Sequence, residues 1–129
     1  MKKIKVKYTI KNSENEITNF ETIGTYDEEK REICYLEQDL EVKLNIQENK
    51  LKMIRKTDDY SIDFDFELNV VTKNKYKLKS LGIYVDIEVE TKRLVINENS
   101  INLKYTLIND DQQIGDFEYD LYWEWYYEH

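Results

Sequence analysis

The stretch "YSIDFDFEL" at residues 60–68 decides the fold class of this chain, because apolar and polar side chains alternate through it without a break. The apolar parity holds Tyr60, Ile62, Phe64, Phe66 and Leu68, and the polar parity holds Ser61, Asp63, Asp65 and Glu67. A period of two places one row of side chains on a core and the other in water, as in an antiparallel sheet. The stretch therefore predicts a strand with one buried face.

The same alternation recurs along the chain at 4–10, 40–47, 85–89 and 101–107. Polar clusters typical of turns separate the runs. They are "NSEN" at 12–15, "DEEK" at 27–30, "QENK" at 47–50, "KTDD" at 56–59, "NENS" at 97–100 and "NDDQQ" at 109–113. This close spacing leaves no room for helical crossovers and predicts a meander of about ten strands.

Composition supports a single all-β domain over residues 1–129. The chain has no Ala or Pro and only 3 Gly, whereas Tyr, Ile, Val, Phe and Thr are plentiful. A meander with one apolar face hides that face by closing into a barrel, which removes the sheet edges, or by folding into a two-layer sandwich. We expect an antiparallel barrel of about eight to ten strands.

Charge patterning gives one test of strand register. Asp63, Asp65 and Glu67 share the polar face of their run, and Lys75, Lys77 and Lys79 share that of the next. Opposite charges on neighbouring strands stabilise a hairpin by a few tenths of a kcal/mol each. We therefore expect these two rows to face each other.

The end of the chain, "FEYDLYWEWYYEH" at 117–129, is unusually aromatic. One parity holds Phe117, Tyr119, Leu121, Trp123, Trp125 and Tyr127. We expect this face to complete the barrel core. The alternatives are a platform on which a ligand stacks and an aromatic patch for a protein partner.

Arg55 breaks the pattern of its strand. In "KLKMIRK" at 50–56 it shares the inward parity with Leu51 and Met53. A buried guanidinium needs partners, because an unpaired desolvated charge is very costly. One interpretation places Arg55 near a barrel mouth or over Trp123 in a cation–π contact. A second makes it an anchor for a ligand carboxylate or phosphate, and a third is a shifted register in which Arg55 faces water.

The sequence lacks the residue patterns of several common catalytic and metal-binding sites. The single histidine, His129, is terminal, which removes Ser-His-Asp and Cys-His catalysis and zinc sites of the usual His/Cys type. The three glycines are isolated, so there is no phosphate loop. The acidic pairs at 58–59 and 110–111 lack the spaced ligands of a calcium loop. We expect no enzyme, no metal and no cofactor.

The only cysteine, Cys34, lies between Ile33 and Tyr35 in an apolar run. No neighbouring cation or helix terminus lowers its pKa, so we expect a packed, unreactive thiol. A lone cysteine also indicates a reducing compartment.

Charge and hydropathy limit the classes of partner that this chain can have. The net charge of −8 argues against nucleic acid, whose phosphates bind Lys and Arg. No segment reaches the ~20 apolar residues of a membrane span, and "MKKIKVK" at the start lacks the apolar run of a signal peptide. We expect a cytoplasmic protein whose oligomeric state the sequence does not specify.

The order of features resembles a known family. "TIGTY" at 22–26, "LKMIRKTDDYSIDFDF" at 51–66, "YKLKSLGIYVDIEVETKRLVI" at 76–96 and "SINLKYTLINDDQQIGDFEYDLYWE" at 100–124 are similar to the YwiB-like proteins, a small bacterial family of unknown function. The resemblance implies a calycin-like β-barrel, the group that includes lipocalins and fatty-acid-binding proteins. It implies no catalytic residue. At the Leu81-Gly82 break of this pattern, glycine allows the backbone angles of a β-bulge.

Two functions follow as hypotheses. The first is a barrel that binds a small, partly apolar or anionic ligand in its interior, with Arg55, Tyr105, Tyr119 and Trp123 as binding residues. The second is a ligand-free interaction or scaffold module, because inward Tyr8, Phe64 and Phe66 add to a crowded interior. An enzyme that uses Arg55 with tyrosines and carboxylates is the least favoured.

Overall fold

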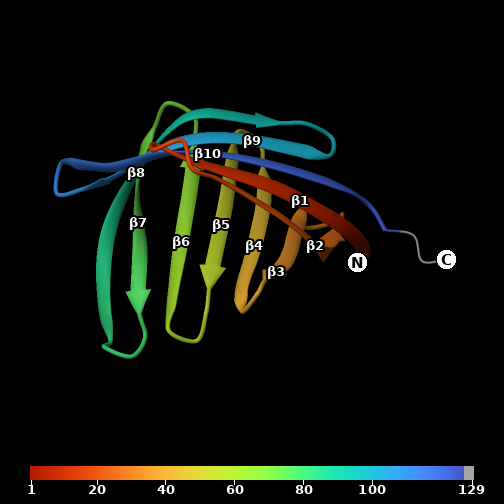
Figure 1. The fold of residues 1–129 in the computed structure, drawn as a ribbon, viewed down its shortest axis with the longest axis horizontal. Helices are drawn as coiled ribbons and strands as arrows, with labels where there is room; N and C mark the ends of the chain where they lie inside the picture. The colour runs from red at the N-terminus through yellow and green to blue at the C-terminus, as the bar shows by residue number, and fades with distance from the viewer. Residues whose placement is uncertain (127–129) are drawn as a thin grey trace.

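The computed structural model describes residues 1–126 of the chain as ten antiparallel strands (Figure 1). The strands are β1 (Lys2–Asn12), β2 (Ile17–Asp27), β3 (Glu32–Glu37), β4 (Leu40–Gln47), β5 (Lys50–Lys56), β6 (Tyr60–Glu67), β7 (Val71–Leu78), β8 (Ile83–Ile96), β9 (Ser100–Asn109) and β10 (Gln112–Trp125). Each strand pairs with its neighbours in sequence, and β1 also pairs with β10. The sheet is a closed barrel, so the predicted all-β barrel is confirmed.

The barrel has two differently oriented sides (Figure 1). Strands β1, β2, β9 and β10 run across the upper part of the view, and β3 to β7 run nearly at right angles to them. The turns at 38–39, 57–59 and 79–82 lie together along the lower edge, where the backbone N–H of Lys79 donates to the carbonyl of Asp59. We call this end of the barrel the mouth.

The predicted alternation accounts for the core. In β6, Phe64 and Phe66 are buried while Asp63 and Asp65 are exposed. Leu68 is exposed, contrary to its parity, because β6 ends at Glu67 and the chain turns there. Most of the barrel is filled by fully buried aliphatic side chains from its other strands, including those of Ile4, Val6, Ile33, Val42, Leu44, Leu51, Ile101, Leu103 and Leu121.

The predicted charge rows are only partly opposed. Asp63 lies opposite Lys75, but the β6–β7 ladder ends there. The next acidic residue, Asp65, pairs with Lys52 of β5 instead, at 3.9 Å between Nζ and Oδ1. Lys79 belongs to the β7–β8 turn and donates its ammonium group to the carbonyl of Thr57. The expected pairing beyond Asp63 is therefore wrong, because the two strands separate.

A buried asparagine bridges the separated part of β6 and β7. The backbone N–H of Asp65 donates to Oδ1 of Asn74 at 2.6 Å, and the hydroxyl of Thr72 donates to the carbonyl of Asp65 at 2.6 Å. The amide nitrogen of Asn74 donates in turn to the carbonyl of Thr72. Side chains thus replace ladder bonds and satisfy backbone groups that burial would otherwise leave unpaired.

The aromatic C-terminal strand closes the core up to Trp123. Tyr119, Leu121 and Trp123 are buried, as predicted, but Trp125 is 41% exposed. Its ladder with β9 ends at Tyr122, so Trp125 is covered from the β1 side only. Tyr127 lies outside the described residues.

Gly82 does not form the expected bulge. It lies in the β7–β8 turn with φ of 63°, a conformation that glycine adopts without strain. The ladder irregularities occur instead between Thr91 and Arg93 and between Gln113 and Gly115. Within residues 1–126, no helix is long and apolar enough to cross a membrane.

Candidate functional site

Arg55 points into the barrel near its mouth. It lies one residue before the end of β5 and continues the inward row of Leu51 and Met53. Its Nη2 donates to Oε2 of Glu37, the last residue of β3, at 3.3 Å. The two side chains are 20% and 21% exposed. The ion pair is therefore largely desolvated but remains reachable from the mouth.

Four tyrosines, which we call the tyrosine cluster, surround this ion pair: Tyr8, Tyr35, Tyr105 and Tyr119. The hydroxyls of Tyr35 and Tyr119 hydrogen-bond to each other across the barrel, from β3 to β10. The Tyr8 ring lies 5.6 Å from the Tyr35 ring and 5.4 Å from the Tyr119 ring. Tyr105 packs on Phe66, with ring centroids 4.9 Å apart. The cluster therefore gathers residues from β1, β3, β9 and β10 around one interior point.

Burial controls the protonation of these phenols. It raises the pKa of Tyr35 to about 12 and that of Tyr105 to about 12, although nearby Arg55 opposes both shifts. Burial also raises the pKa of Tyr119, with a further contribution from Tyr35. A desolvated phenolate is unfavourable, so the hydroxyls stay protonated at neutral pH. They can therefore donate hydrogen bonds.

Arg55 stays charged in the same environment. Burial alone would lower its pKa, but Tyr35, Tyr119 and Glu37 outweigh that effect and raise the pKa. The site thus combines a fixed cation, one carboxylate and protonated phenols.

The Tyr8 hydroxyl is the unsatisfied group of the cluster. Tyr8 is 3% exposed, and its hydroxyl has no hydrogen-bond partner among the described residues. Burial raises its pKa, and the neighbouring Glu37 carboxylate adds to the shift. An unsatisfied buried hydroxyl costs about 1–3 kcal/mol. A ligand atom that accepted from Tyr8 would remove that cost.

Three of the four predicted binding residues meet here, and one does not. Arg55, Tyr105 and Tyr119 lie in the same interior region. Trp123 stacks instead on Tyr26, with ring centroids 6.1 Å apart and an interplanar angle of 22°. The charged partner of Arg55 is Glu37, so the predicted cation–π contact with Trp123 is wrong.

Sequence reasoning missed Glu37 as the counter-ion. The signal was available in "EICYLE" at 32–37, where Ile33, Tyr35 and Glu37 share one parity. Glu37 breaks an inward apolar row just as Arg55 does. Two inward rows interrupted by opposite charges predict a buried ion pair, provided that their strands are near neighbours.

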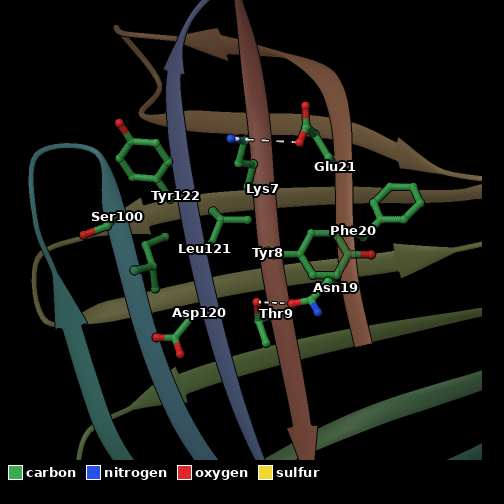
Figure 2. Close-up of a pocket in the computed structure, with 11 residues that line it drawn as sticks. Lys7, Tyr8, Thr9, Asn19, Phe20, Glu21, Ser100, Asp120, Leu121 and Tyr122 are labelled. Carbon is green, nitrogen blue, oxygen red and sulfur yellow. Dashed lines mark hydrogen bonds and ion pairs between the residues drawn. The ribbon is translucent and has the colours of Figure 1, made fainter. Parts of the chain in front are cut away.

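A second concavity lies on the outer surface (Figure 2). This groove of about 570 Å³ crosses β1, β2, β9 and β10. Its polar groups pair with one another: the Thr9 hydroxyl donates to Oδ1 of Asn19 at 2.8 Å, and Nζ of Lys7 lies 4.0 Å from Glu21. The charged groups of this groove are exposed to solvent and pair with one another. We therefore take the Arg55 region as the candidate site.

Cys34 faces outward on β3, between Thr25 of β2 and Lys43 of β4. Its side chain is half-buried, so the predicted packing of the thiol is only partial. Burial raises its pKa, and the nearby Glu32 carboxylate adds to the shift. Within residues 1–126, no three His, Cys, Asp or Glu side chains are grouped to hold a metal.

The raised pKa of Cys34 gives a testable reactivity. Thiolate is the nucleophile, so a raised pKa lowers the reactive fraction at neutral pH. We expect native protein to react with Ellman's reagent more slowly than urea-unfolded protein, and the native rate to rise with pH. Complete labelling within seconds at pH 7 would contradict this.

Taken together, the fold and the site define a closed ten-stranded antiparallel barrel with a polar cluster inside its mouth. The chain belongs to the family described as a domain of unknown function, DUF1934, whose model matches residues 4–121.

A solved structure shares the fold. The crystal structure of the YwiB protein from Bacillus subtilis superposes with a TM-score of 0.69 and 18% sequence identity, over 97% of this chain and 91% of that one. At this identity the likeness shows the fold alone, and it confirms the predicted resemblance to YwiB-like proteins. No curated protein sequence is significantly similar.

Proposed function

We propose that this protein is a non-enzymatic, cytoplasmic bacterial protein that binds a small ligand with an anionic head and a partly apolar body at the barrel mouth. The observation that carries the proposal is the Arg55–Glu37 ion pair, largely desolvated yet about one-fifth exposed, inside a ring of tyrosines. Removing charged groups from water is costly, and groups with perturbed pKa values are common at binding sites.

Arg55 has hydrogen-bonding capacity for such a head group. A guanidinium carries five N–H donors, and a carboxylate can accept two of them side by side. Among the described residues, Glu37 accepts one bond from Arg55, in a single-pronged geometry. The protonated Tyr8 hydroxyl would supply a further donor to the same ligand oxygen or its neighbour.

The apolar body would lie near the mouth rather than deep in the barrel. Fully buried side chains fill the rest of the interior. Phe20, Tyr60 and Ile62 are only partly buried and pack against the core. They supply apolar surface for a short chain or ring.

The protonation states favour binding over catalysis. The phenols have raised pKa values and act as donors, not bases. Arg55 is a permanent cation. A filled core favours a second candidate, a ligand-free interaction module, because a deep ligand cavity would need space that these side chains occupy.

Fluorescence of 1-anilinonaphthalene-8-sulfonate, an aromatic anion, tests the ligand site. We expect decanoate to displace the dye about tenfold better than decanol, because a charged hydrogen bond adds roughly 1.5–3 kcal/mol. Arg55→Met should weaken dye and decanoate binding by at least about tenfold. Lys56→Met, which removes the adjacent outward charge, should leave both unchanged.

A double variant separates binding from stability. Arg55→Met alone leaves Glu37 partly buried without its cation, so some stability should be lost. Arg55→Met with Glu37→Gln removes both charges and should recover that stability while binding stays lost. Equal dye and decanoate binding by wild type and Arg55→Met would refute the site and favour the ligand-free module.

A further inference from the structure

Strand β2 has a free edge along its first half. It pairs with β1 from Ile17 to Tyr26, but with β3 only from Gly24 to Asp27. β3 is short and turns into β4 after Glu37. Within the described chain, residues 17–23 therefore have no ladder partner on the β3 side. Alternate backbone N–H and C=O groups there point along the sheet, away from β1, and have no strand to pair with.

This edge lacks the features that usually block strand addition. Lysine, proline and bulges commonly protect sheet edges, and "ITNFETI" at 17–23 has none of them. Ile17 and Ile23 are 59% and 44% exposed. The one charge, Glu21, is held by Lys5 of β1, at 2.7 Å between Oε1 and Nζ.

The inward side of the edge lies next to one unsatisfied polar group, the Tyr8 hydroxyl. Phe20 is half-buried and lies 5.3 Å from the Tyr8 ring. Asn19 and Glu21 turn to the outer face, toward Thr9 and Lys7 (Figure 2). An added strand would place one side chain against Phe20, above the buried and unpartnered Tyr8 hydroxyl.

The turns near the edge carry exposed acidic side chains, whereas Lys5 and Lys7 on the neighbouring strand β1 lie close to Glu21. Glu14 and Glu16 in the β1–β2 turn are exposed, and so is Asp39 in the β3–β4 turn. A second copy of this chain would bring its own net charge of −8 and be repelled. A basic segment would be attracted.

We propose that the free edge of β2 binds an extended peptide segment of another protein by strand addition. The segment alternates apolar side chains, which face Phe20, with basic side chains, which face solvent and the acidic turns. Main-chain hydrogen bonds supply affinity, and the alternate side chains supply specificity. This interaction goes beyond the small-ligand site and does not require it.

The peptide acetyl-KVKFKVK-amide, labelled with fluorescein, is a suitable probe, and acetyl-EVEFEVE-amide is its charge-reversed control. We expect the basic peptide to bind at least about tenfold more tightly at low salt, since complementary charge favours the encounter. Hydrogen exchange at amides within 17–23 should slow in the complex. A KVKFKVK analogue N-methylated at every residue should give no such protection, because it lacks backbone donors.

Substitutions on the edge test the location. Phe20→Lys adds a cation where the apolar side chain should dock and is expected to weaken binding of the basic peptide at least about tenfold. Val71→Lys, an exposed change on β7 that adds the same charge, should leave it unchanged. If Phe20→Lys fails to fold, hydrogen exchange at amides 17–23 in the wild-type complex still locates the bound peptide.

The outcomes separate the alternatives. Absence of protection at 17–23 with saturating basic peptide would overturn the proposal, as would equal binding of the N-methylated analogue. Concentration-dependent protection without peptide, with dimers in sedimentation, would assign the edge to a second copy instead. Arg55→Met should keep peptide binding, so failure of the small-ligand site and failure of the edge are distinguishable.

Discussion

Trp123→Ala is expected to lower the free energy of unfolding by about 3–5 kcal/mol, the range for removing a large aromatic from a core. Trp123 is 3% exposed and lies opposite Val6 in the β1–β10 ladder that closes the barrel. Its ring stacks on Tyr26 of β2, so the substitution would open a cavity between three strands. Urea unfolding monitored by circular dichroism measures the change.

Trp125→Ala is the matched control, on the same strand and two residues along. Trp125 is 41% exposed and touches Tyr26 edge-on, with Lys2 above its ring. An exposed cation–π contact contributes roughly 0.5–1 kcal/mol. We expect a loss of about 1 kcal/mol. Equal losses of unfolding free energy in Trp123→Ala and Trp125→Ala would show that the barrel does not close through Trp123.

Gly24→Ala should cost about 3 kcal/mol, at the upper end of overpacking effects. A Cβ at this position would stand 2.5 Å from the carbonyl oxygen of Cys34 and 3.0 Å from Cβ of Tyr35. The oxygen belongs to the backbone of β3, so relief requires the strand to move. Only four residue pairs join β2 to β3, and Gly24–Tyr35 is the terminal one. We expect the β2–β3 ladder to be the first part of the barrel to separate on unfolding. Hydrogen exchange in β3 should become faster, and the melting temperature should fall.

Gly115→Ala provides the contrast. The added Cβ would meet the Phe117 ring at 3.4 Å and the Ser13 hydroxyl at 3.5 Å, which are ordinary contacts with side chains. We expect a change below about 1 kcal/mol, as for most surface substitutions. A large loss at Gly115 together with a small one at Gly24 would contradict the β2–β3 packing.

The inward direction of Arg55 could be predicted from sequence, but its partner could not. Leu51 and Met53 set the parity of β5, and the structure keeps it. Glu37 lies on β3, two strands away, and the side chains meet across β4. Nothing in the local pattern of β5 distinguishes Glu37 from Trp123 as the partner, because that choice depends on how far each strand is shifted along its neighbours.

The same distinction holds for the charge rows. The polar parity of Asp63 and Asp65 was predictable, and both are exposed. The separation of β6 from β7 beyond Asp63 was not, because it depends on Asn74 inserting its side chain between the two strands. The free edge of β2 has a similar origin, since it depends on where β3 departs after Tyr35.

By itself, the sequence determined the secondary structure, the turn positions and the face that most side chains occupy. These are local properties, set by a period of two and by polar residues between the runs. Only the tertiary structure decided that β1 closes on β10, that Trp125 emerges from the core, and that Arg55 meets Glu37 beside the tyrosines. These depend on inter-strand shift and closure, which many weak contacts between distant residues fix together and no single segment encodes.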